Sequence, residues 1–429
     1  MRHEALGFEA IPRPTRHAVF GHLHEWVGKG NAQKVLETLL DYAERCGPVA
    51  RIPLGPANLV LVSDPDPIRE LLAAEQANVK GWPYVLTRVV LDNVLLLNGE
   101  PWASARGAYR AALKGADAER ACEAGLARHL GSLVSGARID AGEWVQALVA
   151  DVVCELLCGA SWDRALEPHR ARVQYELAAV GIDMQCQPWA YLSPARWVAM
   201  RRSVAVMRAF FLAHVEARLE SPEDRDDVLG GFLRAADEGA YPREANALRD
   251  GLVNFFFTAH DVVSASASFC LWLLAAHPNA QRAARDDDDA LGRAVRESLR
   301  LFPGYPLFSR RTKGEVEVGG YRVPVGTDVI VSPFVLHRLE RHWPDASRFD
   351  PDRFHGALEP VRPGSRGAYM PFGGGYRSCI AFALAFPLLE RIVRRVIRHA
   401  ELRADPSHVP DIVYWGSTSS ANGLPIRVA

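Results

Sequence analysis

The segment Phe372-Gly373-Gly374-Gly375-Tyr376-Arg377-Ser378-Cys379 is the most informative stretch of this chain of 429 residues. Its three consecutive glycines carry no Cβ atoms, so their backbone N–H groups can come close to the sulfur of Cys379. The apolar run Ile380–Leu389 follows at once and predicts a helix whose positive end faces that sulfur. Arg377 offers a guanidinium for an anionic group. The segment therefore predicts a cysteine thiolate that binds a metal, and the alternative is a glycine-rich turn before a structural cysteine.

A second pattern lies upstream of this segment. Glu297 and Arg300 are three residues apart in a predicted helix that ends at Pro303. Arg353 follows in the stretch from Trp343 to Phe354 and could complete a charge triad with them. A buried ionic network is costly unless each member is satisfied, so its expected value is correct registry rather than net stability.

In this order of motifs the chain resembles the cytochrome P450 family, whose haem-binding loop reads Phe-Gly-Gly-Gly-x-Arg-x-Cys. The resemblance implies a mainly α fold with small β-sheets, the cytochrome P450 fold. It also implies haem b, with Cys379 as the proximal thiolate and Phe372, Gly373 and Arg377 as neighbours of the haem. A thiolate ligand pushes electron density to the iron and favours O–O bond cleavage, so the implied activity is that of a monooxygenase. By the same resemblance, the Glu–Arg–Arg triad lies behind the haem loop.

The resemblance also assigns residues to the haem propionates. Trp102 and Arg106 are four residues apart and share a predicted helix face. Trp-x-x-x-Arg in this part of the chain resembles the P450 helix that donates to one propionate. Arg310 holds the position of the family's other propionate arginine, and the adjacent Arg311 could take that role if the loop shifts by one residue.

The long predicted helix from Ala247 to Ala276 departs from the family at its oxygen-activating segment. Where P450s usually carry Ala/Gly-Gly-x-Asp/Glu-Thr over the haem, this chain reads Thr258-Ala259-His260-Asp261-Val262. Ala259 keeps a small residue over the haem, and Asp261 keeps the acid. Val262 replaces the alcohol, and a valine methyl cannot donate a hydrogen bond. The resemblance therefore predicts more release of peroxide and less oxygen insertion.

Several explanations of this replacement stay open. Thr258 lies one helical turn before Val262 and could supply the missing hydroxyl. The substrate could bring its own hydroxyl or carboxylate. Val262 could simply pack against the substrate, with poorer coupling. Finally, the enzyme could be a peroxygenase or isomerase that needs no electron donor. A haem sensor without catalytic activity is the least favoured reading.

The resemblance also indicates which residues line the substrate pocket. They are mostly apolar and aromatic, which suits a hydrophobic ligand oriented by few polar groups. The expected substrate is an apolar or aromatic small molecule, oxidised by hydroxylation, epoxidation or oxidative coupling in specialised metabolite biosynthesis. Ordinary core packing is the alternative for each of these side chains. The candidates are Tyr84, Phe255, Leu307, Phe308 and Trp415.

Local patterns predict three further features. The runs Val49–Pro53 and Asn58–Val62 predict a hairpin, and Tyr321–Ile330 predicts two short strands about a turn. The charge run Asp286–Asp289 predicts a solvated loop.

Composition sets the wider expectations. The formal net charge is −1, which suggests no nucleic-acid partner, and we expect a soluble, cytoplasmic monomer without a membrane segment. We expect residues 1–429 to form a single P450 haem domain without a fused reductase, because no flavin or iron–sulfur motif is visible. Electrons would then come from an acidic ferredoxin or flavodoxin with its reductase. A basic face for that partner is expected from Arg110, Lys114, Arg391, Arg394, Arg395 and Arg398, and a solvated helix face is the alternative.

Overall fold

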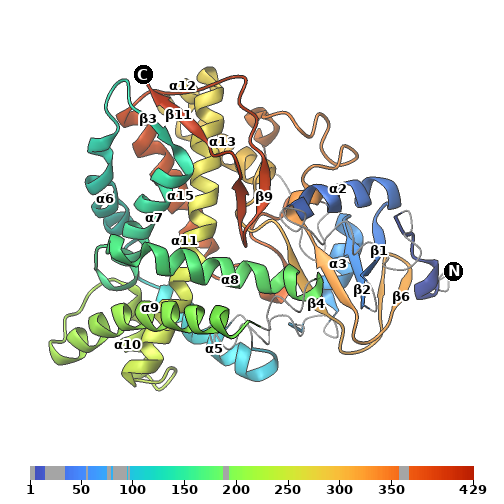
Figure 1. Cartoon of the computed structure of the whole chain (residues 1–429), viewed down its shortest axis with the longest axis horizontal. Coiled ribbons are helices and arrows are strands. Elements are labelled where there is room, and N and C mark those ends of the chain that lie inside the picture. The colour runs from blue at the N-terminus through green and yellow to red at the C-terminus, as the bar shows by residue number, and fades with distance from the viewer. Residues whose placement is uncertain are drawn as a thin grey trace.

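A computed structural model of the chain describes residues 5–14, 34–54, 57–74, 79–80, 94, 97–186, 193–356 and 367–429. These residues form a mainly helical protein with small β-sheets, as the sequence predicts. Figure 1 shows most helices gathered around the long helix α11 (Ala245–Ala276). Four strands lie to one side, towards the N-terminus: β1 (Val49–Leu54), β2 (Ala57–Val62), β4 (Phe308–Arg311) and β6 (Tyr321–Val323).

The helices vary in length from one turn to nearly nine. They are α2 (Val35–Cys46), α3 (Pro65–Ala73), α5 (Gly99–Leu113), α6 (Ala118–His129), α7 (Ala141–Cys158), α8 (Glu167–Cys186), α9 (Pro194–Glu220), α10 (Val228–Asp237), α11 (Ala245–Ala276), α12 (Pro278–Asp286), α13 (Asp288–Leu301), α14 (Pro333–Leu336) and α15 (Phe382–His399). The strands are β1 (Val49–Leu54), β2 (Ala57–Val62), β3 (Arg138–Asp140), β4 (Phe308–Arg311), β5 (Val316–Val318), β6 (Tyr321–Val323), β7 (Asp328–Val331), β8 (Leu402–Ala404), β9 (Ile412–Tyr414), β10 (Thr418–Ser420) and β11 (Pro425–Val428).

Helix α11 is the centre of the core. It has 32 residues and packs against α7, α9, α10, α13 and α15. Between Gly251 and Ala275 its side chains are buried except those of Thr258, Ala259, Asp261 and Val262. Among the described residues, α11 alone is long and apolar enough to cross a membrane, and 78% of its most apolar window is buried inside the protein. The helix is therefore a core element that opens at one point, the segment identified from the sequence.

The largest sheet fixes one wall of the candidate site. Its strand order is β1-β2-β7-β4, with the expected β1–β2 hairpin antiparallel, β7 parallel to β2, and β4 antiparallel to β7. The strands predicted about the turn at 324–327 both form, but β6 pairs with β5 whereas β7 joins the large sheet. At the edge of this sheet, the Arg311 N–H donates to the Val79 carbonyl at 2.8 Å, which brings Lys80 next to β4.

Two local predictions were wrong. The helix after the cysteine loop begins at Phe382 rather than directly at Cys379, because Ala381 is the N-cap, with φ −94° and ψ 10°. The acidic run 286–289 is not a loop but the junction of α12 and α13. Asp287 caps α13 by accepting from the N–H groups of Asp289 and Ala290, at 3.0 and 3.2 Å.

Candidate active site

The cysteine loop depends on its glycines. Gly373 and Gly375 have φ values of 68° and 67°, a region that other residues rarely adopt. A Cβ on Gly375 would also lie 3.1 Å from both the Cβ and the carbonyl oxygen of Leu72. The loop is closed by the Cys379 N–H, which donates to the Phe372 carbonyl at 3.0 Å. This geometry leaves the Cys379 side chain accessible at the end of a tightly constrained turn.

The surroundings of Cys379 shift the pKa of its thiol in both directions. Water can reach the side chain, yet the surrounding protein desolvates the sulfur enough to raise the pKa of the thiol. The Ala381 N–H and the Arg106 guanidinium lower that pKa. Because both groups favour the thiolate, they would assist metal binding at this sulfur.

Four cationic side chains from separate parts of the chain gather next to this loop. Burial, together with Arg310 and Arg106, lowers the pKa of Arg377 to about 10. Burial, Arg310 and Arg377 hold the pKa of Lys80 well below its usual value. Cations that lower one another's pKa values favour the binding of an anion between them. The arrangement therefore suits a ligand that carries carboxylates.

Trp102 helps to order this cluster. The Cζ atoms of Arg377 and Arg106 lie 4.6 and 5.5 Å from the centroid of its ring, and Arg106 also donates to the Ser378 carbonyl at 2.7 Å. Arg310 is buried beside Phe308, whereas the next residue, Arg311, pairs with Asp328 at 2.9 Å. Because successive side chains of a strand point to opposite faces, β4 directs Arg310 towards the cluster and Arg311 away from it.

Lys80 was not anticipated from the sequence. It stands in no motif. The pairing of Val79 with Arg311 brings it to the cluster, and its backbone N–H donates to Oδ1 of Asn98, which also accepts from Arg377.

The open segment of α11 has two chemically different sides. The Thr258 hydroxyl lies 2.8 Å from the Asn254 carbonyl and 3.2 Å from that of Phe255, so its one proton is directed at the helix backbone. The Asp261 carboxylate instead contacts the ring of His260 at 2.8 Å and the guanidinium of Arg170 at 3.2 Å.

Val262 packs against the loop that follows α13. The Val262 carbonyl accepts from the Ser266 hydroxyl at 2.8 Å and lies 2.5 Å from the position that a Cβ on Gly304 would take. The absence of that Cβ lets the loop approach α11 closely.

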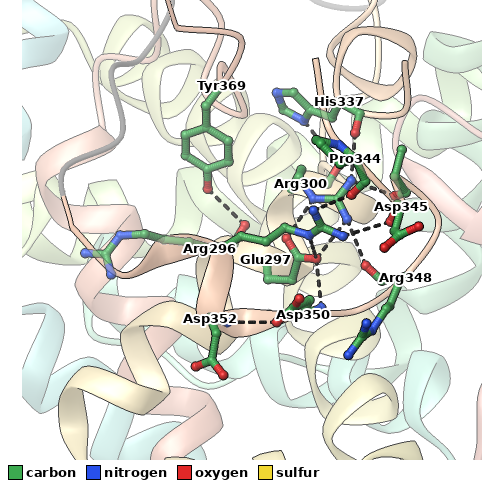
Figure 2. Close-up of polar contacts among 12 residues, drawn as sticks. Arg296, Glu297, Arg300, His337, Pro344, Asp345, Arg348, Asp350, Asp352 and Tyr369 are labelled. Atoms are coloured by element: carbon green, nitrogen blue, oxygen red, sulfur yellow. Dashed lines mark hydrogen bonds and ion pairs between the residues drawn. The ribbon is translucent and has the colours of Figure 1, made fainter. Parts of the chain in front are cut away.

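Two members of the Glu–Arg–Arg triad, Glu297 and Arg300, are buried and point toward each other, as Figure 2 shows, and the third, Arg353, is partly buried beside Glu297. Arg300 binds both carboxylate oxygens of Glu297, at 2.7 and 2.8 Å. It also donates to the carbonyls of His337 and Ala346, each at 2.7 Å, and of Arg348 at 3.0 Å. These contacts use all the N–H donors of the guanidinium, so the buried charge is fully satisfied.

The triad is tied to the cysteine loop through His337. The Met370 N–H donates to its Nε2 at 2.9 Å, so Nδ1 carries the proton that the Arg300 carbonyl accepts at 3.2 Å. Burial and Arg300 lower the pKa of His337 to about 3, which keeps the ring neutral. Arg353 lies 3.4 Å from Glu297 and donates to the Asp345 carbonyl at 2.8 Å. Tertiary contacts thus fix the segment that precedes the cysteine loop.

The predicted pocket residues have different surroundings. Tyr84 lies outside the described residues. The ring of Phe255 packs in an aromatic cluster with those of Tyr109 and Phe232, at centroid distances of 4.9 and 5.8 Å, which favours core packing. Leu307 and Phe308 are buried at the start of β4. Trp415 is partly buried after β9, with its ring 5.4 Å from that of Tyr175 on α8.

The predicted basic face is largely neutralised. The four arginines of α15 pair with acidic residues on α6 and α13: Arg391 with Glu119, Arg395 with Glu123, and both Arg394 and Arg398 with Asp288. Arg110 and Lys114 instead line a cavity of about 300 Å³ next to Ile380, Ala381 and Leu384, and the described residues show no ion pair for them. The basic surface at the cysteine loop is therefore smaller than the sequence suggested.

Comparison with known proteins identifies the family of this chain. The sequence profile of the family described as "Cytochrome P450" matches residues 11–423. The chain belongs to the cytochrome P450 family. It is 28% identical to the probable cytochrome P450 4s3 of Drosophila melanogaster, over 98% of this chain and 92% of that protein. It is also 28% identical to the cyclooctat-9-en-7-ol 5-monooxygenase of Streptomyces melanosporofaciens, over 84% of this chain and 83% of that protein.

Solved structures confirm the fold. A six-coordinate cytochrome P450 from Thermus thermophilus superposes with a TM-score of 0.73 at 23% identity, covering 92% of this chain and 98% of that one. The protein is thus a cytochrome P450 monooxygenase, and the family implies a haem cofactor, a substrate and a redox partner. A haem carries two carboxylate side chains, which fits the cationic cluster beside an accessible cysteine.

Proposed function

We propose that this P450 inserts one atom of molecular oxygen into an apolar or aromatic small molecule, in a specialised biosynthetic pathway. The observation that carries the proposal is the convergence of three features: an accessible cysteine in a glycine-rich turn, a cationic cluster next to it, and the open point of α11. We propose a soluble, monomeric, cytoplasmic protein in which residues 1–429 form a single haem domain.

The bound haem b would supply the iron at which oxygen is reduced and from which it is transferred. Cys379 would bind the metal as a thiolate, which Arg106 and the Ala381 N–H favour. Lys80, Arg106, Arg310 and Arg377 would hold the propionates, with Trp102 between two of the arginines. Phe372 and Gly373 would shape the loop against the haem.

On the α11 side, some residues would bind the haem or the substrate and others would hold protons. Ala259 would leave room above the haem, and Val262 would offer an apolar contact to the substrate. Asp261 would hold a proton at its carboxylate. The Thr258 hydroxyl already donates within the helix, which makes it a poor replacement for the missing alcohol.

A substrate that carries its own hydroxyl fits this arrangement better. The name of the Streptomyces relative states that it acts on cyclooctat-9-en-7-ol, itself an alcohol. For the present chain, we propose a largely hydrocarbon substrate whose hydroxyl is directed at the α11 face. Hydroxylation, epoxidation and oxidative coupling would all use the same residues. Leu307, Phe308 and Trp415 stay candidates for the pocket wall.

Electrons would come from an acidic ferredoxin or flavodoxin with its own reductase. Because the arginines of α15 are paired with acids, the partner would dock mainly on Arg110 and Lys114. Their cavity also reaches Ile380 and Ala381, close to the cysteine loop, which would keep the path for electrons short.

The test is an untargeted mass-spectrometric comparison of small-molecule extracts incubated with the haem-loaded protein. One arm receives NADPH, a ferredoxin with its reductase and isotopically labelled oxygen gas, and the other receives peroxide without oxygen. Products that gain one labelled oxygen atom only in the first arm support the proposal and identify the substrate.

The replacement of the alcohol by Val262 favours a second candidate, a peroxygenase or isomerase without an electron donor. Products confined to the peroxide arm, or products of unchanged mass in both arms, would establish that candidate instead. A protein that binds haem but forms no product in either arm would point to a sensor.

A further inference from the structure

His260, the residue before the acid of α11, has an unusual hydrogen-bonding position. Its Nδ1 lies 2.8 Å from Oδ1 of Asp261, and its Nε2 lies 3.0 Å from the Gln146 carbonyl on α7. A carbonyl can only accept, and an ionised carboxylate can only accept. A neutral imidazole carries one N–H, so it cannot satisfy both contacts. Either the ring is an imidazolium, or the Asp261 carboxyl is protonated and donates to Nδ1.

The surroundings favour an additional proton on this pair. The side chain of His260 is 1% exposed, and that of Asp261 is 13% exposed. From α8, the buried Arg170 pairs with Asp261 and with Glu167, so these side chains bring two negative charges and one positive charge together. One more proton on the pair balances them. The His260 ring also stacks on Phe256 at a centroid distance of 5.4 Å, a contact that suits a cation.

A polar cavity of about 280 Å³ leads to this pair. Glu143 and Gln146, which are exposed on α7, line its outer part, and Asp261 and Ser264 line it along α11. The Ser264 hydroxyl is 2% exposed and has no hydrogen-bond partner among the described residues. A buried hydroxyl of this kind is normally satisfied by water, and the cavity is large and polar enough for several molecules.

We propose that His260 and Asp261 together hold one proton between Nδ1 and Oδ1, in addition to the proton on Nε2, and that this pair is the proton source on α11. Water in the cavity would refill it. Insertion of one oxygen atom, with the other released as water, consumes two electrons and two protons. The donor protein supplies the electrons, and the pair passes protons on from Oδ1 of Asp261. His260 is thus a positioning residue that keeps Asp261 supplied where Val262 offers no alcohol.

The use of these protons in oxygen insertion rests on the proposed monooxygenase function. The number of protons that His260 and Asp261 hold does not depend on that function. The first measurement is therefore made without turnover, on the carbon monoxide complex of the reduced protein, which is diamagnetic. Nuclear magnetic resonance of ¹⁵N-histidine and ¹³C-aspartate would report the protonation of His260 and Asp261 at neutral pH, with signals assigned by loss in His260→Gln. The expected result is either two N–H groups on the ring or a protonated carboxyl. A ring with one N–H beside an ionised carboxylate would overturn the proposal.

The second measurement tests proton supply. Glutamine has both a donor and an acceptor but does not take up a proton, so His260→Gln should lower product formed per electron pair at least about tenfold, with the balance released as peroxide. His277→Gln is the matched control, because His277 ends the same helix, where its Nδ1 lies 2.8 Å from the Leu273 carbonyl and its ring packs against that of Phe349. Equal coupling in both variants would overturn the role of the pair. Failure of the wild type to form any product would refute the monooxygenase proposal, while the proton count would still decide the state of the pair.

Discussion

Replacement of Arg300 by lysine tests whether the buried triad is held by hydrogen bonds or by charge alone. Arg300 is completely buried and directs its N–H groups at Glu297 and at the carbonyls of His337, Ala346 and Arg348. Lysine keeps the positive charge but has only three donors, which cannot reproduce the planar guanidinium. At least two of the buried acceptors would lose their partner.

Each unsatisfied buried acceptor costs about 1–3 kcal/mol, so Arg300→Lys should destabilise the protein by about 2–6 kcal/mol. The measurement is urea unfolding of the haem-loaded protein, followed by circular dichroism and by haem absorbance. Arg282→Lys is the control, because Arg282 is exposed on α12 and, among the described residues, donates to the Asn279 side chain alone. If the free energy of unfolding of Arg300→Lys were within about 0.5 kcal/mol of that of the control, a positive charge alone would be sufficient to stabilise the triad, and the reasoning would be refuted.

Further predictions concern the same site. Burial and Arg300 lower the pKa of His337 from 6.5 to about 3, so the stability of the folded protein should fall as the pH drops from 6.5 towards 3. The loss is at most about 5 kcal/mol, and His337→Gln should flatten this part of the pH profile of urea unfolding. Val262→Thr should reduce the peroxide released per electron pair, and an unchanged leak would mean that another group already supplies the hydrogen bond. Cys379→Ser should abolish the thiolate-type carbon monoxide spectrum while leaving the circular dichroism unchanged. Gly375→Ala should weaken haem retention, because a Cβ meets Leu72 in a strained backbone region, and wild-type retention would contradict that geometry.

Features that are set by residues close together in the chain were the easiest to predict from the sequence. The turn that carries Cys379 and the pairing of Glu297 with Arg300 are each set by residues close together in the chain, where spacing predicts geometry. The length and burial of α11 follow in the same way from its apolar composition. The choice between Arg310 and Arg311 needed the strand pairing of β4, because adjacent residues of a strand face opposite sides.

Contacts between residues far apart in the chain could not be predicted from the sequence. Helical spacing placed the arginines of α15 on one face, but it could not reveal that Glu119 and Glu123 of α6 lie opposite two of them. Lys80 reaches the cationic cluster through the bridge between Val79 and Arg311, which are far apart in the chain, and through its contact with Asn98. No local pattern predicts such contacts. Charge patterns in a sequence therefore overestimate the free charge of a surface and miss charges that the fold brings together.

The same distinction bears on Val262. By sequence alone, the loss of the alcohol is a change in one side chain, and the hydroxyl of Thr258, one helical turn earlier, is the obvious substitute. The structure shows that this hydroxyl donates to its own helix, while His260 and Asp261 contact α7 and α8. A neutral imidazole beside an ionised carboxylate could not satisfy both contacts of the His260 ring. On the proposal made above, a change that removes a donor on one face of α11 thus coincides with a shared proton on the neighbouring face. The chemistry of the segment is better understood from these two faces together than from the family position that Val262 occupies.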